Sequence, residues 1–203
     1  MSGQVLALQM CSGINAEQNM ASLRLSLQQL PKMRPLLVCL PEAFLIFSKS
    51  SQASYQLGLK IDGYKAQLAQ LCKQHDIWLA AGTVPVSQDN GKYLAASFLF
   101  NSQGDVVAQY NKIHLFDVDV ADYTRCYRES DATQAGSDIV VVDSPFGKIG
   151  LAVCYDLRFS GLFSAMQRQG AELILVPSAF TVVTGAAHWH HLLAARAIET
   201  QSY

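Results

Sequence analysis

The thiol of Cys154 is the side chain of this sequence that is best placed to act as a nucleophile. It ends the apolar segment KIGLAVC and precedes a predicted helix, so it would lie at a tight strand-to-helix turn. Helix N-termini and nearby cations lower the pKa of a thiol from about 8.5 and thereby favour the nucleophilic thiolate. Free cysteines are more often small buried apolar side chains. We interpret Cys11, Cys39 and Cys72 in that way, whereas Cys126 in a polar loop stays unassigned.

A cysteine nucleophile also needs a base and a group that stabilises an oxyanion. Glu42 follows the apolar segment LLVCLP, just past a predicted buried strand, where α/β enzymes gather their catalytic groups. Lys112, in YNKIHLF, lies between a predicted strand and an apolar triplet. Taken alone, Glu42 could equally be a solvated loop carboxylate and Lys112 a surface lysine. Together with Cys154 they would supply a base, a cation and a nucleophile.

The elements that must position these residues alternate between helices and short apolar strands. Asn15 is a predicted N-cap, Gln18 completes a capping box with it, and Pro31 ends the helix that follows. Further strands and one more helix are predicted in the first half from apolar runs and periodicity. These are strands over residues 5–10, 36–40 and 77–86, and a helix over residues 64–75.

The second half of the chain is richer in short β-segments. LAASFLF, DVVAQY, DIVVVD and KIGLAVC are separated by hairpin-type turns at residues 101–104 and 144–147. A helix follows Cys154, residues 172–176 form another strand, and a last helix runs from about residue 188 to 199. Helices that flank mostly apolar strands indicate an α/β protein built in layers.

The composition bounds the class of protein. With 203 residues the chain is most simply one domain. Half of the residues are hydrophobic and 15% are charged. Ordinary domains have roughly 25% charged residues, so this chain favours much buried sheet and an apolar face covered by another subunit. The net charge of −1 and the pI near 6.5 exclude an electrostatic partner such as nucleic acid or an anionic membrane.

Cysteine usage and the first residues indicate the compartment. Five cysteines without compact spacing do not predict a disulfide framework and favour a reducing environment. The segment MSGQVLALQMCSG lacks a basic leader, and no stretch approaches the roughly 20 apolar residues of a membrane span. We therefore expect a soluble cytoplasmic protein.

Three blocks of the sequence resemble the catalytic blocks of the nitrilase (carbon–nitrogen hydrolase) superfamily, in the same order. They are PEAF around Glu42, NKIHLFD around Lys112 and GLAVCYDLRF around Cys154. RESDATQAG, which contains Glu129, and PSAFTVVTGAAHWHHLLAARAIETQ are similar to the Nit branch, with its deaminated-glutathione amidases and omega-amidases. The resemblance covers essentially the whole chain, and three motifs in register are far more specific than one cysteine.

The resemblance implies an α/β fold of the nitrilase type, a four-layer αββα sandwich that pairs with another subunit. Residues 1–203 would form a single carbon–nitrogen hydrolase domain. Chains of the family continue past the position of Tyr203 for several strands, so we expect this domain to be C-terminally incomplete. A sheet without its closing strands exposes an edge that promotes association.

The resemblance also implies a mechanism of amide hydrolysis. Glu42 would take the proton of Cys154, and the thiolate would attack the amide carbonyl. Lys112 and the backbone N–H of Tyr155 would hold the oxyanion, and Glu42 would then protonate the departing ammonia. Water activated by Glu42 would hydrolyse the thioester. Glu129 would be the second glutamate of the family and would hold Lys112 and the substrate amide in place.

Substrate recognition is less specified than the chemistry. We predict contacts with the oxyanion or the substrate for Tyr155, Phe180 and Thr181. Asp156 and Arg158 would form polar contacts beneath the nucleophile turn, or Arg158 would instead bind a substrate carboxylate. This chain departs from the branch after the Cys154 block, where Ser160-Gly161 replaces Pro-Glu, and over residues 45–51. We expect a small carboxylate-bearing amide, such as deaminated glutathione or a 2-oxo acid omega-amide, and less readily a nitrile or an N-carbamoyl compound.

Other interpretations carry less weight. His188, His190 and His191 do not share one helix face, and no acidic cluster accompanies them, so we predict no metal and no cofactor. A Cys–His–Asp hydrolase that pairs Cys154 with His114 or His188 is an alternative. A non-catalytic interaction protein on an amidase-like scaffold is another, since a fold does not guarantee a function.

Overall fold

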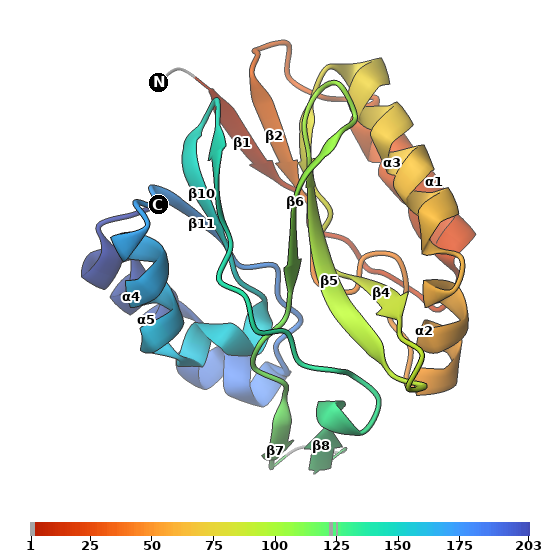
Figure 1. Ribbon diagram of the computed structural model, residues 1–203, viewed down its shortest axis with the longest axis vertical. Coiled ribbons are helices and arrows are strands. Elements are labelled where there is room, and N and C mark those ends of the chain that lie inside the picture. Colours follow the sequence, from red (N-terminus) through yellow and green to blue (C-terminus); the bar gives the residue numbers. More distant parts are fainter. Residues whose placement is uncertain (1–2, 122–123, 125) are drawn as a thin grey trace.

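Two β-sheets face each other at the centre of the molecule, and helices cover the outer side of each sheet (Figure 1). The computed structural model describes residues 3–121, 124 and 126–203. Apolar side chains of both sheets meet in the middle, where Leu37 and Leu99 of the larger sheet pack with Leu151 and Leu175 of the smaller one. The α/β class and the αββα order of layers that the sequence predicts are thereby confirmed (Figure 1).

The larger sheet has six strands in the order β1-β2-β3-β5-β4, with β6 paired to β5. The first three strands are parallel, and β5 runs antiparallel to β3, β4 and β6. The strands are β1 (Gln4–Ala7), β2 (Leu36–Cys39), β3 (Trp78–Ala80), β4 (Val84–Ser87), β5 (Tyr93–Phe100) and β6 (Val106–Asn111). Strand β2 is buried along its length, as its continuous apolar run predicts.

Three helices cover the outer face of this sheet: α1 (Ala16–Leu27), α2 (Ser51–Gly58) and α3 (Ile61–His75) (Figure 1). The side chain of Asn15 accepts a hydrogen bond from the backbone N–H of Gln18, so the predicted N-cap is confirmed. Helix α2 was not predicted. Its buried residues are Ser54 and Gly58, and such a small polar face leaves no apolar periodicity in the sequence.

The smaller sheet has the order β11-β10-β9 and is covered by two helices (Figure 1). Its elements are β9 (Val141–Ser144), β10 (Gly147–Leu151), β11 (Leu173–Leu175), α4 (Ser160–Arg168) and α5 (Val182–Thr200). Helix α5 begins six residues before the predicted start, because the Thr181 side chain caps it by accepting from the N–H of Thr184. Within the described residues, no helix is long and apolar enough to cross a bilayer.

Two short strands and two single turns complete the fold near the site. Strands β7 (Asp117–Asp119) and β8 (Cys126–Arg128) form an antiparallel pair. The 3₁₀ turn η1 (Glu129–Asp131) follows β8, and the 3₁₀ turn η2 (Cys154–Arg158) follows β10. Both turns carry residues that the sequence predicts to be catalytic.

The single strand predicted over residues 77–86 is wrong, because Gly82 divides it into β3 and β4. Gly82 has φ +46°, and a Cβ there would collide with the backbone oxygen of Pro41. The next residue, Thr83, accepts a hydrogen bond from the backbone N–H of Ala43 at 2.8 Å. The break therefore supports the segment that carries Glu42.

Replacing Gly82 by alanine is expected to cost about 3 kcal/mol or more of unfolding free energy, because it combines a left-handed backbone with a backbone collision. Gly63→Ala is the matched control. Gly63 lies in α3, and the position that an added methyl group would take is open space, so that change is expected to be neutral or to stabilise by up to about 1 kcal/mol. Urea unfolding monitored by circular dichroism measures both. Equal stability of the two variants would contradict the supporting role of Gly82.

Candidate active site

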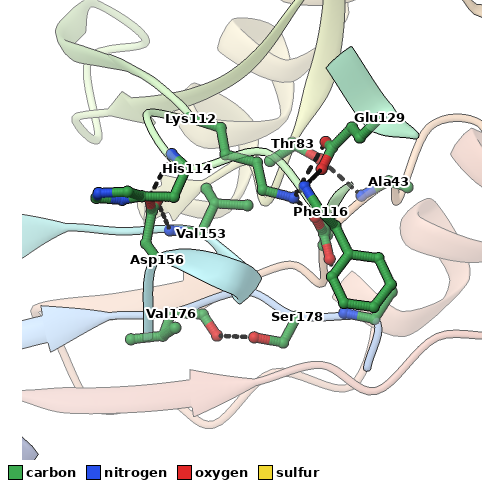
Figure 2. Close-up of polar contacts among 12 residues, drawn as sticks. Ala43, Thr83, Lys112, His114, Phe116, Glu129, Val153, Asp156, Val176 and Ser178 are labelled. Atoms are coloured by element: carbon green, nitrogen blue, oxygen red, sulfur yellow. Dashed lines mark hydrogen bonds and ion pairs between the residues drawn. The ribbon is translucent and has the colours of Figure 1, made fainter. Parts of the chain in front are cut away.

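The ammonium group of Lys112 lies at the centre of a buried cluster of charges (Figure 2). Lys112 directly follows β6, and its side chain is only 2% exposed. Its Nζ lies 3.0 Å from Oε1 of Glu42 and 2.8 Å from Oε2 of Glu129. Three residues from separate parts of the chain, each predicted to be catalytic, are thus brought into direct contact.

Electrostatics keep this cluster charged. Burial by itself would lower the pKa of Lys112, but the negative charges of Glu42 and Glu129 outweigh it and raise that pKa. Burial raises the pKa of Glu129, the charge of Glu42 adds to this effect, and Lys112 opposes it. Lys112 therefore stays a cation throughout the physiological range, as a group that stabilises an oxyanion must.

Glu42 is held from several sides just beyond β2. One carboxylate oxygen accepts from Lys112, and the other accepts from the backbone N–H of Ala179 at 2.8 Å. The neighbouring Ala43 has φ +54° and is tethered to Thr83. The side chain of Glu42 is 12% exposed, so the carboxylate has little freedom and little contact with solvent.

Glu129 is held in place by the backbone N–H of Phe116 as well as by Lys112. Its Oε2 accepts from the N–H of Phe116 at 2.6 Å in addition to Lys112 (Figure 2). The ring of Phe116 packs edge-on against Tyr155, with centroids 5.2 Å apart. Glu129 therefore joins the cation to an aromatic wall of the site.

Cys154 is the first residue of η2 and lies at the strand-to-helix turn that the sequence predicts. Its backbone has φ +47°, which costs a residue other than glycine roughly 1–3 kcal/mol. The Cys154 N–H donates to the carbonyl of Pro177 at 3.0 Å, which helps to hold this conformation. The residue is 7% exposed and lines the same cavity as Glu42 and Lys112.

The pKa of the Cys154 thiol is raised well above its ordinary value, so the expectation of a lowered pKa is wrong for the resting protein. Burial is the main cause, and the charge of Glu42 and its hydrogen bond to the thiol add to it. Lys112 opposes the shift without cancelling it. The predicted nucleophile is therefore a neutral thiol at rest, and a base would be needed to make it reactive.

These groups open into a cavity of about 1590 Å³. Of the predicted substrate contacts, Tyr155, Phe180 and Thr181 line it. Arg158 does not belong to its described lining; its guanidinium lies 3.2 Å from Nδ1 of His188 and over the rings of Tyr155 and Phe180. The volume exceeds the roughly 300–1,000 Å³ of ordinary ligand pockets, so the cavity accommodates more than an amide group.

Sequence reasoning missed three residues that position the catalytic side chains: Thr83, Phe116 and Ala179. The last two act through backbone N–H groups, which leave no residue-type signal. For Thr83 the available signal was the Gly-Thr pair that interrupts an apolar stretch.

The histidines take other roles. His114 and His188 are absent from the described lining of the cavity that contains Cys154, so the structure does not favour a Cys–His–Asp arrangement. His114 is bound to Asp156, and His188 lies against Arg158. Across the residues that the structure describes, no three His, Cys, Asp or Glu side chains gather closely enough to hold a metal ion.

Similarity to known proteins agrees with this geometry. A deaminated glutathione amidase of Yersinia enterocolitica is 42% identical over an alignment of 203 positions that covers 98% of this chain and 71% of the relative. An omega-amidase of Xenopus laevis is 37% identical over 145 residues, or 71% of this chain and 52% of the relative. Among solved structures, the NitFhit protein of Caenorhabditis elegans superposes with a TM-score of 0.89 at 33% identity, covering 98% of this chain and 49% of that one.

The sequence of residues 5–203 matches the family model described as carbon–nitrogen hydrolase. The match spans the segments that carry Glu42, Lys112 and Cys154, and the predicted resemblance to the nitrilase superfamily is confirmed. The chain belongs to the carbon–nitrogen hydrolase family.

Proposed function

We propose that this protein hydrolyses the C–N bond of a small amide through a thioester on Cys154. The observation that carries the proposal is the buried Lys112 ammonium between the carboxylates of Glu42 and Glu129, in one cavity with the thiol. A neutral thiol, a carboxylate hydrogen-bonded to it and an obligatory cation are the parts that acyl transfer requires.

In the acylation step, Glu42 takes the thiol proton while the sulfur of Cys154 attacks the amide carbonyl carbon. The carbonyl oxygen becomes an oxyanion, which Lys112 and the backbone N–H of Tyr155 stabilise. Collapse of the tetrahedral intermediate breaks the C–N bond, and Glu42 returns the proton to the nitrogen. The leaving group is ammonia for a primary amide and an amine for a substituted one.

In the deacylation step, Glu42 removes a proton from water, and the hydroxyl oxygen attacks the thioester carbonyl. The sulfur leaves as a thiolate and recovers its proton from Glu42. Glu129 keeps Lys112 aligned in both steps, because it shares the ammonium with Glu42.

The substrate that we propose is a carboxylate-bearing amide, with deaminated glutathione or a 2-oxo acid omega-amide as the best candidates. The names of the Yersinia and Xenopus relatives support this class. The cavity supports it as well, since the charged residues of its described lining outside the catalytic cluster are Lys49 and Arg128, both cations. Its volume leaves room for the length of a tripeptide-sized molecule.

We further propose that the protein acts as a homodimer or larger homo-oligomer in the cytoplasm. Helix α5 exposes Ile198 (77%), and Ala187 and Ala194, which share its helix face, are exposed as well, so a second copy of the chain would cover this apolar surface. The described cysteines are all free thiols, which suits a reducing compartment.

Removing the thiol tests the proposed reaction. Cys154→Ala is expected to abolish hydrolysis, and Cys154→Ser to lower kcat about 10³-fold or more, because a hydroxyl is much harder to deprotonate than a thiol. A panel of amides, including deaminated glutathione and 2-oxo acid omega-amides, is assayed for released ammonia or amine, and mass spectrometry locates the acyl group. Unchanged turnover, or an acyl group on another cysteine, would refute the mechanism.

Glu42→Gln distinguishes two effects of Glu42: its role as a base and the effect of its negative charge on the pKa of Cys154. Hydrolysis is expected to fall by orders of magnitude, because no base remains.

Alkylation of Cys154 by iodoacetamide near neutral pH is expected to speed up by about threefold or more in the same variant. Glu42 raises the thiol pKa, so its neutralisation lowers that pKa and increases the thiolate fraction. Burial raises the pKa of Cys39 and Cys72 to about 12, so these residues serve as slow internal controls. Slower alkylation of Cys154 would contradict the assignment.

The oligomer is tested by light scattering. We expect at least twice the mass of the 22.2 kDa chain, and a smaller assembly after Ile198→Glu, which places a charge on the exposed surface of α5. Val106→Glu is the matched control, since Val106 is also an exposed apolar residue but lies on β6. A monomeric wild-type protein would exclude this proposal.

A further inference from the structure

The carboxylate of Asp156 is completely buried and accepts four hydrogen bonds, of which those from His114 and Val153 can be followed in Figure 2. Its Oδ1 accepts from the backbone N–H of His114 at 2.9 Å and lies 2.7 Å from the ring Nδ1 of the same residue. Its Oδ2 accepts from the hydroxyl of Tyr110 at 2.6 Å and from the backbone N–H of Val153 at 2.9 Å. Four donors satisfy the four sites of an ionised carboxylate, which offsets the cost of burying it.

The directions of these bonds follow from the chemistry of the partners. A carboxylate only accepts, so Nδ1 of His114 carries a proton. Burial, and next the charge of Asp156, raise the pKa of Tyr110, so its hydroxyl also stays protonated and donates. Asp156 is therefore a fixed anchor held by three residues from two chain segments, residues 110–114 and the segment that ends in Val153.

These two segments also carry two of the proposed catalytic residues, Lys112 and Cys154. Val153 immediately precedes the nucleophile Cys154, and Asp156 itself follows it in η2. His114 lies two residues beyond Lys112, and Tyr110 lies two residues before it. The carboxylate thus ties the nucleophile turn of the smaller sheet to the end of β6 in the larger sheet.

The His114 ring is held in place on its other side as well. It stacks on Phe159 with centroids 3.6 Å apart and planes 8° from parallel. Phe159 in turn donates its backbone N–H to the carbonyl of Asp156 at 2.9 Å. The His114 ring is therefore held between Asp156 and Phe159, next to η2 and outside the described lining of the cavity.

We propose that Asp156 and His114 form a clamp that sets the position of the Cys154 thiol relative to the Lys112 ammonium. In this role His114 is a positioning residue and does not touch the substrate. Its effect on turnover rests on the proposed amide hydrolysis, whereas its effect on the thiol does not. Misplacement of reacting groups by about 1 Å can cost about 100-fold in rate, so a loosened clamp would show in the chemical step.

The test compares four variants of the whole protein with the wild type. The amide nitrogen of Asn occupies the place of Nδ1 in His, whereas that of Gln reaches the place of Nε2. His114→Asn therefore keeps the bond to Asp156, and both His114→Gln and His114→Ala lose it. Phe159→Leu is the control that removes the stacked ring and leaves the hydrogen bond.

We expect kcat per titrated active site to fall about 10- to 100-fold in His114→Ala and His114→Gln, with KM within about twofold of the wild type. Iodoacetamide is expected to alkylate Cys154 more slowly in both, because the thiolate lies less favourably beside Lys112. His114→Asn is expected to recover most of kcat and of the alkylation rate, and Phe159→Leu to remain near wild type. Thermal unfolding shows that the variants compared are folded.

Two results would overturn the clamp. One is a kcat and an alkylation rate within twofold of wild type in folded His114→Gln. The other is an Asn variant that is folded and no better than the Gln variant. If His114→Ala does not fold, the Asn–Gln pair decides alone. If the wild type releases no product from any amide, the proposed function fails, and the alkylation rates of Cys154 still decide the clamp.

Discussion

A lysine ammonium with 2% exposure dictates how the site of this protein must be built. An isolated buried cation would shed its proton or unfold the chain, so Lys112 needs negative partners within contact distance. Glu42 and Glu129 supply them, and each is then buried in turn and needs its own donors. The backbone N–H groups of Ala179 and Phe116 meet this need. One charge thereby fixes how four chain segments converge.

The same charges explain why Cys154, the proposed nucleophile, rests as a thiol. A thiolate in contact with Glu42 would add a third negative charge to the two of Glu42 and Glu129, and burial disfavours that state further. Transfer of the proton from Cys154 to Glu42 leaves the total charge unchanged. After the transfer, Lys112 faces one carboxylate, from Glu129, and a thiolate that is about to become part of an oxyanion intermediate. The cluster is therefore arranged for charge to move within it.

The sequence predicted most of the strands, most helices and the four residues of the cluster. Apolar runs mark the strands that precede Glu42, Lys112 and Cys154, and the resemblance to one family added Glu129. The sequence did not predict the direction of the Cys154 pKa shift, which depends on burial and on the approach of Glu42. Helix α2 was missed because it packs through Ser54 and Gly58. The break at Gly82 was missed because its cause is the close approach of the Pro41 carbonyl, which is distant in sequence. Such features arise from tertiary contacts that local patterns do not encode.

The site lies across the boundary between the two sheets. Its central residues carry the proposed chemistry, whereas the peripheral lining of the cavity is placed to recognise the substrate. Glu42 and Lys112 belong to the larger sheet, whereas Cys154 follows a strand of the smaller one. Hydrogen bonds cross the boundary near the site between Ala179 and Glu42, and between Asp156 and residues on both sides of Lys112. The peripheral lining of the cavity comes largely from residues 46–51, β8 and the start of α5, which take no part in these hydrogen bonds. Loops on a rigid scaffold tolerate change. The preferred amide can therefore vary at those segments while the distances that govern acyl transfer stay the same.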